Sequence, residues 1–142
     1  MANDVVNDFA RSMGIATSGL RAQAGRMRVI SENIANADST ASTSGGEPYR
    51  RKIQSFSSEL DRTLDASVVS LGKIRPDPSA FRVKHEPGNP AADAAGNVRY
   101  PNVNPLIEMT DMRDAQRSYE ANLNIISATR RMIQRTLDIL KA

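Results

Sequence analysis

Residues 27–40, "MRVISENIANADST", decide the fold because an apolar helical pattern stops there and a polar segment begins. Ile30 and Ile34 are four residues apart, so they lie on one side of a helix. Asn tolerates left-handed backbone geometry and caps helices well, so Asn33 and Asn36 predict a helix end. Asn33 also lies beside the apolar side, where a polar side chain can fix the register of two packed helices through a hydrogen bond.

Upstream of this stretch, apolar residues recur at alternating steps of three and four, which is the heptad spacing of one long helix. Acidic residues stand near its start and arginines near its end, as the helix macrodipole favours. Residues 1–36 are therefore predicted to form a helix with an assembly seam, interrupted at Gln23, of Val6, Phe9, Met13, Ala16, Leu20, Met27, Ile30 and Ile34.

The last part of the chain repeats the pattern. Asn104 suits a helix N-cap and Pro105 suits the first helical position, so a second helix is predicted over residues 105–142. Gln116 and Arg130 interrupt its seam. The apolar members of that seam are Met109, Met112, Tyr119, Leu123, Ile126, Ile133, Leu137 and Leu140.

Each helix carries a second apolar row beside its seam. The rows repeat every seven residues and lie about 100° of helix rotation from the nearer part of the seam. One partner helix covers only a narrow seam, so a hairpin of two helices from this chain alone leaves the second rows exposed. We expect another molecule to cover Ile15, Ala22 and Val29 in the first helix and Ile125, Met132 and Ile139 in the second.

Residues 37–104 have the composition of loops and short strands. Strands are predicted within "YRRKIQSFSSEL", in "SAFRVKH" and in "GNVRYP", and the intervening "NPAADAA" suits a turn. The predicted fold is mainly α. Its long terminal helices (1–36 and 105–142) pair as an antiparallel coiled coil, and the middle (37–104) is irregular with small β pieces.

Composition excludes several classes of function. The chain has 142 residues, 4% aromatic residues and no cysteine, so neither disulfides nor thiolate chemistry enters. A net charge of +3 is spread among carboxylates, which disfavours nucleic-acid binding. No apolar run approaches the roughly 20 residues of a membrane span, and the N-terminus lacks the pattern of a cleaved secretory signal.

The sequence offers little catalytic chemistry. The single His85 lies in "VKHEPGNP" with no second histidine, so it is predicted to be a solvated loop residue rather than a metal ligand. The glycines match no phosphate-binding loop, and no cofactor is expected. The basic run Arg50, Arg51 and Lys52 indicates a solvated face or a contact for an acidic neighbour. We predict that the chain is not an enzyme.

Three stretches together resemble one family. "SENIANADST", "GGEPYRRK" and "NPAADAAGNVRYPNVNPLIEMTDMRDAQRSYEANLNIISATRRM" are similar to the flagellar basal-body rod proteins, most closely the type of the proximal rod. The first motif is shared across rod and hook proteins, whereas the other two favour this type. The positions that match the family's motifs are Asn33, Ile34, Asn36, Tyr49, Asn102, Val103, Asn104, Glu108, Met109 and Met112.

The resemblance implies a structural role in bacterial motility. In that family the terminal helices pair and stack with those of other subunits into a tube around the export channel, forming a torque-transmitting axle. The implied partners are copies of the chain, other rod proteins and the flagellar type III export apparatus. The implied location is the periplasm-spanning rod of the basal body, reached without a cleaved signal peptide.

A second hypothesis of another class is a self-contained helical-hairpin module or adaptor that binds proteins. Both hypotheses predict the heptads, but only the rod subunit accounts for the second apolar rows and for a long middle with little core.

Overall fold

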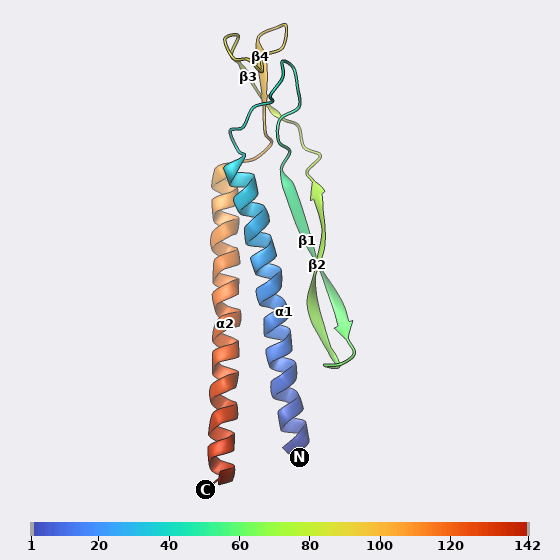
Figure 1. The fold of residues 1–142 in the computed structure, drawn as a ribbon, viewed down its shortest axis with the longest axis vertical. Helices are drawn as coiled ribbons and strands as arrows, with labels where there is room; N and C mark the ends of the chain where they lie inside the picture. Colours follow the sequence, from blue (N-terminus) through green and yellow to red (C-terminus); the bar gives the residue numbers. More distant parts are fainter. Residues whose placement is uncertain (1, 142) are drawn as a thin grey trace. The chain divides into compact units, whose positions relative to one another are not determined.

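The computed structural model describes residues 2–141 and the side chains of residues 7–139. Residues 2–141 contain two long helices and four strands (Figure 1), which agrees with the predicted helix-rich chain with small β pieces in its middle. In chain order they are α1 (Ala2–Ala35), β1 (Lys52–Asp61), β2 (Ala66–Pro76), β3 (Arg82–His85), β4 (Asn97–Tyr100) and α2 (Pro105–Lys141).

The chain forms two compact units, and both helices contribute to each. Unit 1 contains the chain up to Arg26, the segment Ser55–Gly72 and the chain from Asp114 onward. Unit 2 contains Met27–Gln54 and Lys73–Arg113. These units cut across the three sequence segments, and the division into domains at 1–36, 37–104 and 105–142 stays a prediction.

In unit 1 the two helices lie side by side with opposite directions (Figure 1). Small side chains allow the close approach: a Cβ added to Gly19 would lie 2.8 Å from Asn122 Nδ2 of α2. The fully buried residues of this unit are correspondingly small, namely Ala16, Ala22, Ala115 and Thr129. Unit 1 therefore has close backbone packing but little large-residue core.

The β1–β2 hairpin lies beside α1 within unit 1. Val69 N donates a hydrogen bond to Ser18 Oγ at 3.1 Å, and Arg11 Nε donates to Leu64 O at 2.9 Å. Asp65, with a φ of 47°, is in the left-handed conformation that closes the turn. β1 starts at Lys52, three residues into the predicted segment, whereas β2 was not predicted.

Unit 2 contains the sheet of β3 and β4, both of which were predicted. The strands are antiparallel, with Arg82 opposite Tyr100 and His85 opposite Asn97. Val98 and Tyr100 pack with Ala91 of the preceding turn in the largest buried apolar cluster of this unit's β region. The β region of unit 2 thus has larger buried apolar side chains than unit 1.

The two helix ends differ in how well they were predicted. Asn104 Oδ1 accepts a hydrogen bond from Leu106 N at 3.1 Å, which confirms the N-cap of α2. At the end of α1, Asn36 is not left-handed. Its Nδ2 instead donates to Glu32 O at 2.8 Å, and Ala37 N donates to Ile34 O at 3.2 Å. A side-chain bond and a tightened last turn therefore end α1.

Gly96 gives a first testable prediction. Its φ is +77°, and an added Cβ would lie 2.9 Å from His85 Cε1, so Gly96→Ala is expected to destabilise unit 2 by about 1–2 kcal/mol. Gly88 has open space around its Cα and is the matched control, because Gly88→Ala adds the same methyl group without a clash. Urea unfolding of both variants measures the difference, and equal midpoints would contradict the prediction.

Candidate functional site

Asn33 joins both helices to the chain between them within unit 2. Its side chain is buried, with 1% of its surface exposed. Nδ2 donates to Glu108 Oε2 of α2 at 3.1 Å and to Lys52 O at 2.9 Å. Oδ1 accepts from Tyr49 OH at 2.8 Å and from Lys52 N at 2.9 Å. All four hydrogen-bonding positions of the amide are occupied, and the bond to Glu108 joins α1 to α2.

Glu108 is as deeply buried as Asn33 and is paired with an arginine. Arg51 Nε donates to Glu108 Oε1 at 2.6 Å, and Arg51 Nη1 lies 3.3 Å from Asp77 Oδ2. Burial alone lowers the pKa of Arg51, but its hydrogen bonds and charge contacts with Glu108 and Asp77 raise it overall. The pKa of Asp77 is lowered, first by the hydrogen bond from Ser79 N. The buried charges are thus compensated within unit 2.

Asn102 positions the arginine's backbone. Its Oδ1 accepts from Arg51 N at 2.8 Å, and its Nδ2 donates to Ser79 Oγ at 2.8 Å. Lys52 forms an ion pair with Glu32 of α1, and the guanidinium of Arg50 lies 4.1 Å from the ring centroid of Phe81. Of the two sequence interpretations of this basic run, the structure supports contact with acidic groups, and these belong to the same chain.

Sequence reasoning missed Arg51 and Asp77 as members of this network. The signal was present but weak, since three consecutive basic residues do not show which one pairs with a buried carboxylate. We call the set Asn33, Tyr49, Arg51, Asp77, Asn102 and Glu108 the polar network.

The other family-motif positions lie around this network. Asn36 and Asn104 bond the backbone at the two helix ends, and Val103 is buried. Ile34 and Met112 are half-buried, whereas Met109 is exposed. The motif therefore covers both packed and exposed positions.

The predicted seam residues of α1 with described side chains are buried or half-buried. Ile30 is buried, and Phe9, Met13, Leu20, Met27 and Ile34 are half-buried, while the side chain of Val6 lies outside the described residues.

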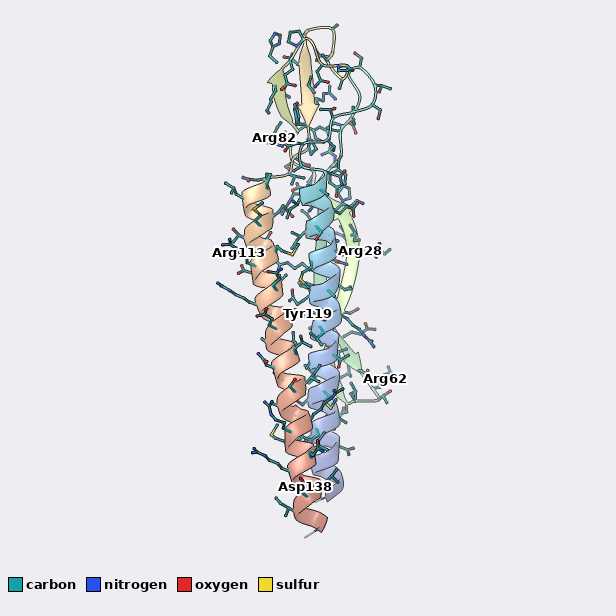
Figure 2. All side chains as sticks on the ribbon, turned by 60° about the vertical axis from the view of Figure 1, so that its left-hand side comes forward. Arg28, Arg62, Arg82, Arg113, Tyr119 and Asp138 are labelled. Carbon is teal, nitrogen blue, oxygen red and sulfur yellow. The ribbon has the colours of Figure 1, made fainter. Side chains whose placement is uncertain are left out.

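In α2, every second buried position lies one residue before the position predicted for the seam. Met112, Tyr119, Ile126 and Ile133 are half-buried, and Figure 2 shows Tyr119 on the side of α2 toward α1. The residues buried between them are Glu108, Ala115 and Thr129, with Asn122 half-buried, so Met109, Leu123 and Leu137 are exposed. The side chain of Leu140 lies outside the described residues. The role of this seam in assembly stays a prediction.

The second apolar rows of the two helices differ in burial. In α1, Ala22 and Val29 are buried, while Ile15 is exposed. In α2, the whole row of Ile125, Met132 and Ile139 is exposed, at 45%, 49% and 76%. We call these three residues the α2 row.

Ile15 and Ile125 line one groove between the helices in unit 1. Its volume is about 370 Å³, and its other lining residues are Asp8, Arg11, Ser12, Ala16 and Asn122. We call it the helix groove. The exposed residues of the two second rows thus meet on the same side of the helix pair.

The histidine does not form a site. His85 is the last residue of β3 rather than a loop residue, and its exposed ring lies with Nδ1 3.3 Å from Asn97 Oδ1. Within residues 2–141, no cluster of three or more potential metal ligands occurs. No helix in this same range combines the length and apolarity needed to cross a bilayer.

Tyr49 gives a prediction for the polar network at high pH. Burial raises the pKa of its phenol from 10.0 to about 12, with additional effects from the charges of Glu32 and Glu108. The folded state thus keeps the proton that the unfolded state releases, so this contribution to stability is complete below pH 10.0 and is lost as pH rises toward about 12.

Ultraviolet titration of phenolate formation in the wild type and in Tyr49→Phe measures this pKa. The difference between the two curves is expected to show one tyrosine titrating near pH 12. A difference curve centred near pH 10 would contradict the burial and hydrogen bonding of Tyr49.

Comparisons with known proteins identify the family. Residues 13–41 match the family model described as "Flagella basal body rod protein", and residues 94–139 match "Flagellar basal body rod FlgEFG protein C-terminal". The first region includes Asn33, and the second includes Asn102 and Glu108 of the polar network. Both ends of the chain therefore point to flagellar rod proteins.

Curated relatives cover almost the whole chain. The flagellar basal-body rod protein FlgC of Agrobacterium fabrum is 53% identical over 128 residues, which are 90% of this chain and 92% of that protein. FlgC of Bacillus subtilis is 41% identical, covering 92% and 97%, and FlgC of Salmonella typhimurium is 36% identical, covering 88% and 92%. These relatives confirm the family predicted from the sequence, and they do not favour the helical adaptor. The chain belongs to the FlgC family of flagellar basal-body rod proteins and is a structural rod subunit, not an enzyme.

Proposed function

We propose that subunits polymerise helically through their terminal helices, which pair as an antiparallel coiled coil, to form the torque-transmitting axle around the export channel. The partners in this proposal are copies of the chain, other rod proteins and the type III export apparatus. The exposed α2 row is the observation that carries it. Three large apolar side chains at seven-residue spacing on one helix flank need a covering surface, which the single chain does not provide.

The small core of unit 1 supports the same proposal. Its fully buried apolar residues are alanines, while several of its larger apolar side chains stay exposed. Burial of about 25 cal/mol per Å² of apolar surface between subunits then supplies stability that the single chain lacks. Many shallow contacts of this kind suit a rod that carries torque.

Incorporation into rods tests the proposal. Ile139→Asp, in a flagellated bacterium lacking its own copy of the gene, is expected to abolish incorporation into purified basal bodies, as measured by immunoblot. Ser127→Asp adds the same charge at an exposed polar position of α2 and is the control. Normal incorporation of Ile139→Asp, or a stable, fully helical monomer that melts cooperatively in dilute solution, would contradict the proposal.

Export without cleavage has a separate test. We propose that the chain reaches the periplasm-spanning rod through the type III apparatus with its N-terminus intact. The intact mass of the protein recovered from basal bodies is expected to equal that of the unprocessed chain. A mass lower by an N-terminal segment would overturn this part of the proposal.

A further inference from the structure

Within unit 1, the β1–β2 hairpin leaves its larger apolar side chains exposed. Within unit 1, β2 alternates between half-buried small or medium residues, such as Ser70 and Gly72, and exposed larger ones. Antiparallel sheets usually show the reverse, with the apolar face covered. The exposed residues Phe56, Leu60, Val69 and Leu71 have exposed fractions between 40% and 61%. We call them the outer face of the hairpin.

Among the described side chains of residues 7–139, these four residues stay at least 40% exposed, and Val69 and Leu71 also line a pocket with Ser18 of α1. The hairpin is held on α1 through Val69 N to Ser18 Oγ and Arg11 Nε to Leu64 O. The side chain of Leu64 also fills the space beside Gly14, where an added Cβ would lie 2.3 Å from Leu64 Cδ1. Within unit 1, α1 lies between the hairpin and α2 (Figure 1). The outer face and the α2 row of one chain therefore remain separate.

A second uncovered apolar surface of unit 1 is elongated. The helix groove begins it with Ile15 and Ile125, and the α2 row continues it through Met132 and Ile139. A two-stranded ribbon with four apolar side chains on one face is complementary to this apolar groove and row, whereas a polar surface is not. Burial of the ribbon against it also explains how an otherwise marginal two-stranded hairpin is stabilised.

Formal charge favours the same pairing. Residues 55–72 of the hairpin carry Glu59, Asp61, Asp65 and Arg62, a formal charge of −2. Residues 123–139 of α2 carry Arg130, Arg131, Arg135 and Asp138, a formal charge of +2. Two copies of α2 repel each other at this point, whereas α2 of one copy attracts the hairpin of another.

We infer that the outer face of the hairpin in one copy packs onto the helix groove and α2 row of a second copy. This inference rests on the proposed assembly into rods and adds which two surfaces meet. The contact is heterologous, since each copy offers a hairpin and receives another. Such contacts repeat into rings or helical filaments rather than closing as dimers.

Cross-linking within assembled rods tests the contact, and the absence of cysteine from the natural chain keeps the background low. Val69→Cys and Met132→Cys are combined in one chain, and purified basal bodies are treated with a short bismaleimide. A ladder of covalent oligomers is expected. Each single variant is expected to lack the ladder, and so is Val83→Cys with Met132→Cys, because Val83 is also an exposed valine but lies on β3 of unit 2.

Immunoblotting of the same basal bodies separates the two claims. Absence of every variant and of the wild-type chain from rods contradicts the proposed function. Presence in rods without a ladder overturns the inference alone. Dimers from Met132→Cys alone would overturn the inference by showing that two α2 rows pair with each other. Cross-links that join Val69→Cys only to another rod protein would overturn it by showing that the partner is not a second copy. Leu71→Cys with Ile125→Cys repeats the test if the first pair is not incorporated.

Discussion

Glu108→Ala is expected to lower the free energy of unfolding of unit 2 by about 3 kcal/mol. The change removes the acceptor of Arg51 Nε and one of the two acceptors of Asn33 Nδ2, so a cation and a buried amide each lose one partner. The value is at the lower end for a broken buried ion pair because the Arg51 side chain keeps 24% of its surface in water and retains Asp77. Hydrogen exchange of the amides of Val98 and Val103 measures the loss within this unit.

Two variants bracket this result. Glu108→Gln keeps an acceptor for Asn33 and removes only the charge, so it is expected to lose less stability than the alanine variant. Glu120→Ala removes an exposed carboxylate from the same helix and is expected to stay within about 0.5 kcal/mol of the wild type. Equal losses in Glu108→Ala and Glu120→Ala would contradict the role of the polar network.

Ile30→Asp is expected to abolish rod assembly and motility. Ile30 has 5% of its surface exposed, and placing an unpaired carboxylate there costs on the order of several kcal/mol. Assembly amplifies the loss, because every subunit in the rod carries the same substitution. The measurements are swimming in soft agar and the amount of the chain in purified basal bodies.

Ser31→Asp is the matched control for this substitution. It introduces the same side chain one residue later on the helix, at an exposed position, and is expected to leave motility near the wild-type level. Wild-type motility of Ile30→Asp would show that the apolar seam of α1 does not need to be buried.

The helices were predictable because each relies on local signals. Heptad spacing, Asn104 as the N-cap and Pro105 at the first helical position are read within a few residues of one another. β3 and β4 were predictable for the same reason. β2 was not, since "ASVVSLGKIRP" contains glycine and bonds α1 through Val69 N, a long-range contact that a local pattern does not reveal.

The rotation of α2 and the polar network depend on residues far apart in the sequence. Heptad spacing predicts the buried face of a helix only to within one position. Close packing of Gly19 against Asn122 buries the row of α2 that includes Ala115 rather than the row that includes Leu123. Arg51 is held in the polar network by Glu108 and Asn102, which lie more than 50 residues farther along the chain. No local pattern of residues encodes such a pairing.

The hydrogen bonds of Asn33 also set the order in which the chain can fold. Its partners follow it by 16, 19 and 75 residues. A chain that emerges N-terminus first forms α1 while this amide still faces water. The Asn33 amide has all of its hydrogen-bond partners only after the start of α2 has emerged. A chain with a fully hydrogen-bonded Asn33 has therefore already formed the start of its C-terminal helix.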